Sequence, residues 1–214
     1  MITIALIFFP LVAALLLLLV KGPQAKNIAL GAAIIEFVVA IYAFTQFQHN
    51  ANTQFEVSYY WVYSLGIMFR VGMDGISLLL VLLTTFLVPI IILTSSKTEY
   101  KNPSLFYSLI LFMQMALVGV FVSLDGFLFY VFWELALIPI YFICLLWGGD
   151  NRAKITFKFF VYTLAGSLLM LAGLIYLYQH TEGMHSFNIA ALYKAGQSLD
   201  VIHQGYVFWA MFMA

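Results

Sequence analysis

Two carboxylic acids stand inside long apolar stretches of this sequence, Glu36 and Glu134. Placing an ionised carboxylate at the centre of a bilayer costs at least ~2.5–3.5 kcal/mol, so an acid at such a position is usually functional. Desolvation favours the protonated form of such an acid, and a neighbouring lysine favours the ionised form. An acid balanced between these effects is suited to a proton relay, whereas a permanently protonated acid serves as a hydrogen-bonding group between helices.

Glu134 has the more informative surroundings, the segment FWELALIP over residues 132–139. A helix that begins at Gly126 places Glu134 ~12 Å along its axis, near the middle of a membrane. Pro139 lies about one turn further on and removes a backbone hydrogen bond, which loosens the helix beside the acid. We therefore predict that Glu134 carries protons, with structural hydrogen bonding as the alternative. For Glu36 the functional and the structural interpretations stay equally open.

Three charged residues stand at the ends of predicted helices. Asp74 and Asp125 each precede a glycine and a new apolar stretch, so both fit helix N-caps, and an ionic role is an equally good reading. Lys158 opens the sixth stretch and fits either a side chain that extends to the membrane surface or a group that admits protons.

Other chemistry finds little support. The four histidines lack the i, i+4 spacing and the neighbouring carboxylates of a metal site, so no metal is expected. The single cysteine, Cys144, cannot form an internal disulfide and is expected to be a packing residue. No phosphate-binding loop, hydrolase elbow or CxxC pair is present, so we expect no redox or hydrolytic chemistry in this chain. A net charge of zero gives no support for nucleic-acid binding.

The composition indicates how these residues are positioned. The 214 residues are 64% hydrophobic and only 8% charged, against roughly 25% charged in soluble domains. A spanning helix needs about 20 apolar residues. We predict an all-α polytopic transmembrane bundle with six complete spans, Ile2–Val20, Ile28–Phe47, Ile76–Ser95, Leu105–Ser123, Gly126–Trp147 and Phe157–Tyr178. A seventh stretch starts at Gly205 and is too short to span, so we expect the natural reading frame to continue.

Loop charges predict the orientation of these spans. One side receives the cations Lys21, Lys26, Lys97, Lys101, Arg152, Lys154 and Lys158, and the other receives Arg70 and Lys194. The positive-inside rule places the first set in the cytoplasm and the N-terminus outside. Residues 1–20 carry no charge, and lysines follow them, which is the order of a retained first helix rather than a signal peptide.

An outer segment over residues 54–72 is rich in aromatic and β-branched residues around a Ser-Leu-Gly turn. This pattern predicts a β-hairpin on the outer face, with an interfacial belt of aromatic residues as the alternative. A further outer segment, 179–204, is polar and is expected to contain a short helix around Ile189–Ala195.

Two blocks, GMDGISLLLVLLTTFLVPIIILTS (72–95) and FVSLDGFLFYVFWELALIPIYFICLLWGG (121–149), resemble the antiporter-like subunits of respiratory complex I, specifically the subunit M (chain 4) group. The segment KITFKFFVYTLAGSLLML (154–171) is similar to the sixth helix of that family, and the resemblance covers the whole chain. It implies half of an inverted-repeat antiporter-like fold. Residues 1–96 would form an N-terminal three-helix segment with the hairpin, and residues 97–214 the first part of the repeat.

The resemblance also implies a function, proton translocation coupled to quinone reduction in NADH:quinone oxidoreductase. The family's fifth-helix acid corresponds to Glu134, and its lysine partner is expected beyond Ala214. Asp125 corresponds to an entrance acid and Lys158 to a sixth-helix lysine. The implied partners are neighbouring antiporter-like subunits in a bacterial inner membrane. FMN, iron–sulfur clusters and quinone would be held by other subunits, and no cofactor by this chain. The alternatives are a subunit of a multisubunit Na⁺/H⁺ antiporter or membrane-bound hydrogenase, or a passive structural anchor.

Overall fold

A computed structural model describes residues 1–20, 22, 24–48, 52–95 and 100–214. Three residues used in the sequence interpretation, Lys21, His49 and Lys97, lie outside these described residues.

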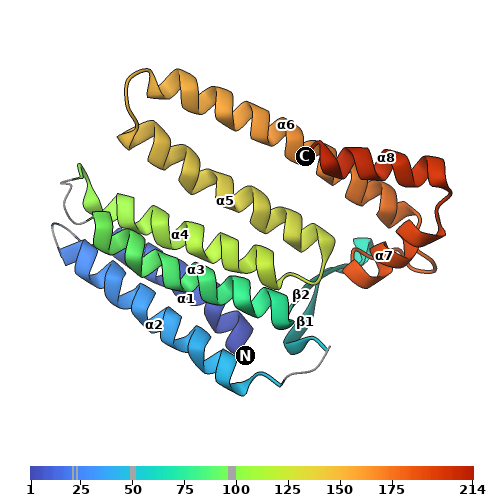
Figure 1. Ribbon diagram of the computed structural model, residues 1–214, viewed down its shortest axis with the longest axis horizontal. Coiled ribbons are helices and arrows are strands. Elements are labelled where there is room, and N and C mark those ends of the chain that lie inside the picture. The colour runs from blue at the N-terminus through green and yellow to red at the C-terminus, as the bar shows by residue number, and fades with distance from the viewer. Residues whose placement is uncertain (21, 23, 49–51, 96–99) are drawn as a thin grey trace.

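Long helices dominate the described chain and run side by side, while the two strands and α7 gather at one end of them (Figure 1). The elements in chain order are α1 (Ile2–Leu17), α2 (Gln24–Gln46), β1 (Gln54–Val62), the 3-10 turn η1 (Tyr63–Leu65), β2 (Ile67–Met73), α3 (Gly75–Thr94), α4 (Pro103–Val122), α5 (Gly126–Trp147), α6 (Arg152–Gln179), α7 (Ile189–Ser198) and α8 (Val201–Phe212). Helices α1 to α4 pack together, α5 packs on α4, and α6 packs on α5 with α8 against it.

Within the described residues, five helices are long and apolar enough to cross a membrane, namely α2, α3, α4, α5 and α6. The chain is therefore a multi-pass membrane protein. The stretch predicted as a first span, Ile2–Val20, is an α-helix only over 16 residues, Ile2–Leu17. Beyond it the backbone tightens, because the N–H groups of Leu18, Leu19 and Val20 donate to carbonyls three residues earlier.

Other helix ends also differ from the hydropathy boundaries. Helix α6 begins at Arg152, five residues before the predicted Phe157, because polar residues form its first turn as readily as apolar ones. Helix α8 begins at Val201 rather than at Gly205, because the Asp200 side chain caps it by accepting from the His203 N–H at 2.9 Å. The short helix expected around Ile189–Ala195 is present as α7.

The predicted hairpin is confirmed. Strands β1 and β2 are antiparallel, with Ser58 opposite Arg70 and Tyr60 opposite Met68. The connection ends at Gly66, whose φ of 62° is the left-handed conformation that glycine adopts without strain. An ion pair across the strands joins Arg70 Nε to Glu56 Oε1 at 2.6 Å.

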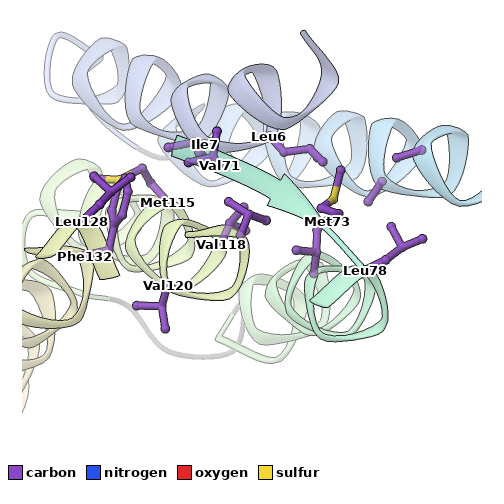
Figure 2. Packing of buried hydrophobic residues seen from close by; sticks show 14 residues of the cluster. Leu6, Ile7, Val71, Met73, Leu78, Met115, Val118, Val120, Leu128 and Phe132 are labelled. Atoms are coloured by element: carbon purple, nitrogen blue, oxygen red, sulfur yellow. The ribbon is translucent and has the colours of Figure 1, made fainter. Parts of the chain in front are cut away.

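Buried apolar side chains form two clusters toward the two ends of α1 to α4, and β2 and the first half of α5 also contribute to the first cluster. The first, nearer the hairpin, includes Leu6, Val71, Leu78 and Val118 (Figure 2). The second is built by the other ends of the same helices and contains Leu17, Ala29, Ile92 and Leu111, among others. Helix α2 contributes a stripe of small residues to both, the buried alanines at positions 25, 29, 32, 33, 40 and 43.

Candidate intramembrane proton site

Helix α5 is fixed at its start by Asp125, which is only 1% exposed. Its Oδ1 accepts from the N–H groups of Phe127 at 3.0 Å and Leu128 at 3.1 Å, and its Oδ2 accepts from Met68 N–H at 3.2 Å. Burial raises the pKa of this carboxyl, while those backbone donors and the nearby Arg70 oppose the rise. One side chain thus caps α5 and attaches it to β2.

The segment just before α5 is also bonded on both sides. The Leu124 N–H donates to the Arg70 carbonyl at 2.9 Å. The Leu124 carbonyl accepts from the Ile189 N–H at 3.1 Å. Gly126 N–H donates to the Phe187 carbonyl at 2.7 Å. The hairpin, the start of α5 and the start of α7 are therefore one hydrogen-bonded unit, which sets the depth at which residues of α5 lie.

Glu134 lies eight residues into α5, ~12 Å below the end of the helix. The helix buries Phe132 against α4, where the ring covers Gly119. Glu134 is two residues further, roughly 200° around the helix at 3.6 residues per turn, so it is directed away from that contact. Its side chain is half-buried, and its Oε1 atom is buried without a hydrogen-bond partner.

Two hydroxyl groups lie near the Glu134 face of α5, that of Tyr130 on α5 and that of Ser167 on α6. Tyr130, one turn earlier, lies close to both the Glu134 side chain and Ser167 on α6. Ser167 is 1% exposed and donates to the Leu164 carbonyl at 3.0 Å. A carboxyl, a phenol and an alcohol therefore form a polar group across the α5–α6 contact.

The backbone next to this group is short of donors. Pro139 is buried inside α5, and it has no N–H to donate to the Leu135 carbonyl four residues earlier. A carbonyl without its usual donor lies one residue beyond Glu134. It can accept from water or from a neighbouring side chain.

The other predicted site residues do not join this group. Lys158 is exposed on α6, six residues after its start, whereas Glu134 lies thirteen residues before the end of α5. At 1.5 Å per residue their depths differ by about 10 Å. Neither ion pair found among the described residues, Arg70–Glu56 and His203–Asp200, includes Glu134 or Lys158. Asp125 is nine residues from Glu134, about 14 Å along the same helix.

Glu36 lies in a different part of the molecule. It is 1% exposed on α2, on the alanine stripe, and α2 packs against α1, α3 and α4. Neither of its carboxyl oxygens has a hydrogen-bond partner among the described residues. Gln114 of α4, which is fully buried, likewise has no partner for either polar atom of its amide.

Three polar residues of these sites were not singled out from the sequence: Tyr130, Ser167 and Gln114. A signal existed for Gln114, an amide inside the apolar run FMQMA. For Glu36 the available signal was its place among alanines at helical spacing, which indicates a buried face. No local pattern identifies Tyr130 and Ser167, because they meet across two helices. Among the described residues, no three His, Cys, Asp or Glu side chains converge as a metal site would require.

Comparison with known protein families divides the chain into two parts. Residues 1–122 match the family described as NADH-ubiquinone oxidoreductase chain 4, amino terminus. Residues 123–214 match the family described as NADH:quinone oxidoreductase/Mrp antiporter, TM.

Similar curated proteins carry related names. The chain is 41% identical to F(420)H(2) dehydrogenase subunit M of Methanosarcina mazei over 192 residues, 87% of this chain and 39% of that protein. It is 36% identical to NADH-quinone oxidoreductase subunit M of Rickettsia conorii over 217 residues, 97% of this chain and 43% of that protein. The chain thus spans less than half the length of these relatives.

Solved structures give the same picture. The fold superimposes on a chain of respiratory complex I from Thermus thermophilus with a TM-score of 0.87 and 27% identity, covering 100% of this chain and 43% of that one. It also superimposes on a chain of the Mrp complex from Dietzia with a TM-score of 0.85 and 16% identity, covering 100% of this chain and 23% of that one. The second likeness is one of fold alone.

Proposed function

This chain belongs to the family of NADH-ubiquinone oxidoreductase chain 4, and from that premise we propose that it acts as a proton-translocating membrane subunit of an NADH:quinone oxidoreductase. Its own part is to move protons. The redox chemistry, with FMN, iron–sulfur clusters and quinone, belongs to other subunits of the complex.

The observation that carries the proposal is the position and burial of the Glu134 side chain. This acid lies at mid-depth in a spanning helix, and one of its oxygens is buried without a partner. Tyr130 and Ser167 extend the polar group toward α6. A protonated acid can donate to a hydroxyl group and an ionised acid can accept from one, so the Tyr130 hydroxyl could serve Glu134 in either state. That is the requirement of a relay.

The other candidate residues have different roles in this proposal. Lys158 is exposed toward the end of α6 opposite the hairpin and is placed to deliver protons from that side. Asp125 holds α5 in position through three backbone donors rather than receiving protons itself. The cationic partner of Glu134 comes from another helix of the full-length protein.

The topology proposed with this function follows the loop charges. The N-terminus and the hairpin lie on the outer side of a bacterial inner membrane, and the lysine-rich loops lie on its cytoplasmic side. Residues 1–96 form an N-terminal segment, and residues 97–214 the first part of an inverted-repeat unit. Neighbouring antiporter-like subunits and lipid cover the apolar faces of α5 and α6, where Trp133 of α5 and Phe157 of α6 are exposed.

A second candidate is a subunit of a multisubunit antiporter, because the family matched by residues 123–214 is described with both activities. Deleting the full-length gene separates the two. Loss of NADH-driven proton uptake by inverted membrane vesicles supports the oxidoreductase. Sensitivity to alkali or sodium with intact NADH oxidation supports the antiporter.

The electron donor is tested separately, because one relative at 41% identity is named for F420H2 rather than NADH. Vesicles from the parent strain are energised with NADH and, separately, with F420H2. Proton uptake that follows only F420H2 and disappears with the gene keeps the translocating role and replaces NADH as the donor.

A further inference from the structure

The two apolar clusters of the N-terminal bundle are separated by a layer of a different kind. On each of α1 to α4, one or two buried residues that are not aliphatic lie between the residues of the first cluster and those of the second. These residues are Pro10 on α1, Glu36 on α2, Thr84 and Thr85 on α3, and Gln114 on α4.

Glu36 and Gln114 occupy the same depth in this layer. Glu36 lies twelve residues into α2 and Gln114 eleven residues into α4, and both helices contribute their first halves to the second cluster and their last halves to the first. The two positions are therefore ~18 Å and ~16 Å from the starts of parallel, packed helices. Each side chain is directed into the bundle, at 1% and 0% exposure.

Four polar atoms in this layer have no hydrogen-bond partner within the part of the chain that the structure describes: both Glu36 oxygens, and the nitrogen and oxygen of the Gln114 amide. A buried polar atom without a hydrogen bond costs about 1–3 kcal/mol, and an isolated buried charge costs far more. Helices α1, α3 and α4 contain no Asp, Glu, Lys, Arg or His that could compensate a charge on Glu36. Among the tyrosines, Tyr107 on α4 is bonded elsewhere, to Ser95 at 3.2 Å.

The neighbouring helices add acceptors at the same level. Pro10 offers no N–H to the Leu6 carbonyl, and Pro89 offers none to the Thr85 carbonyl. The Thr85 hydroxyl donates to the Val81 carbonyl at 2.9 Å, which leaves its oxygen able to accept. A water molecule needs two to four polar partners to be held in an interior, and this layer supplies them.

We propose that Glu36 and Gln114 form a second intramembrane proton site, in which bound water joins a protonated Glu36 carboxyl to the Gln114 amide. The ligand of this site is water, and the exchangeable proton is that of the Glu36 carboxyl. A hard cation is disfavoured, since calcium takes six to eight oxygen ligands and the layer offers one carboxyl and one amide. This site is enclosed by α1 to α4 and separate from Glu134 on α5, so it does not depend on the proposed relay.

The test is infrared spectroscopy of the full-length protein in its assembled complex. The C=O band of protonated Glu36 is the carboxylic acid band that disappears in Glu36→Gln at neutral pH. We expect this band to be present and to shift when the buffer is exchanged to D2O, because water reaches the site. Gln114→Leu should shift it again through the lost hydrogen bonds, whereas Met113→Leu, a volume-matched change beside it, should leave it in place.

Three results would overturn the proposal: no acid band lost in Glu36→Gln, a band that ignores D2O, or a band unaffected by Gln114→Leu. If Gln114→Leu does not assemble, Gln114→Met replaces it, and the D2O response of the wild type decides on its own. Glu134→Gln should leave the Glu36 band unchanged, which separates failure of this site from failure of the relay.

Discussion

At the scale of single residues, Asp125 and Glu134 belong to the same helix but their carboxyl groups have opposite surroundings. Asp125 accepts three backbone hydrogen bonds, so its position is fixed. Glu134 keeps one buried oxygen without a partner and has Tyr130 beside it. A carboxyl held by fixed donors is suited to stabilising a fold, and one with open hydrogen-bonding capacity is suited to exchanging a proton.

We predict that Asp125 contributes mainly to stability. In Asp125→Ala, three buried or half-buried N–H groups lose their acceptor, so unfolding should become easier by about 2 kcal/mol or more. Thermal unfolding of the detergent-solubilised protein measures this loss. Asp125→Asn, which keeps an acceptor oxygen for the start of α5 and has no carboxyl proton, should pump at the wild-type rate per assembled complex, and its failure to pump would assign Asp125 to the proton path.

Asp74 caps α3 in a reciprocal arrangement. Its Oδ1 accepts from Ser77 N–H at 2.7 Å, and Ser77 Oγ accepts from Asp74 N–H at 2.8 Å. The bond from Ser77 lowers the pKa of the Asp74 carboxyl below its ordinary value.

Because the folded-state pKa is lowered, the stabilisation from ionised Asp74 is complete above the ordinary value of about 3.9 and is lost as the pH falls through the lower folded value. Asp74→Ala should cost about 1 kcal/mol near neutral pH and less in acid. Asp74→Asn, which keeps an acceptor, should remove the pH dependence. An equal loss for Asp74→Ala at pH 7 and pH 3 in thermal unfolding would show that the ionised carboxylate contributes nothing.

At the scale of elements, close contact between α4 and α5 positions Glu134 relative to the N-terminal bundle. The Phe132 ring lies over Gly119, where a β-carbon would overlap it. Phe132 and Glu134 leave α5 in nearly opposite directions, so the depth and rotation of the acid follow from this contact.

We therefore predict that Gly119→Ala destabilises the protein by about 1–3 kcal/mol, the usual cost of overpacking, and lowers proton pumping by displacing α5. Gly31→Ala on α2 is the matched control, because its β-carbon meets open space and alanine favours helix by up to about 1 kcal/mol. Unfolding and pumping measured on both variants check the prediction. Equal behaviour of the two would mean that the Phe132 contact does not position Glu134.

The elements were largely predictable from the sequence, and the site was only partly so. Apolar length identified the spans α2 to α6, and aromatic and β-branched residues around a Ser-Leu-Gly turn identified the hairpin, because both signals are local. Glu134 was recognisable as a charge in an apolar run. Its companions Tyr130 and Ser167, and the Glu36–Gln114 layer, depend on which helices pack together, and sequence spacing within one helix does not contain that information.

At the scale of the whole molecule, the N-terminal bundle is joined to the helices that follow by the packing of α5 on α4 and by the short segment before α5. Helices α1 to α4 enclose their own apolar clusters, while α5 and α6 extend beyond them with exposed apolar faces. The segment before α5 bonds to β2 on one side and to the start of α7 on the other. The N-terminal bundle thus supports α5 and α6, the helices of the proposed relay.

The central claim, that Glu134 relays protons, is tested most directly by NADH-driven proton uptake into inverted vesicles carrying Glu134→Gln in the full-length gene. NADH oxidation and assembly are measured in the same vesicles, with Glu182→Gln, an exposed loop acid, as the control. We predict that proton uptake collapses in Glu134→Gln while the complex still assembles, and that Glu182→Gln matches the wild type. Unchanged uptake and turnover in Glu134→Gln would contradict the relay and leave the chain a structural anchor.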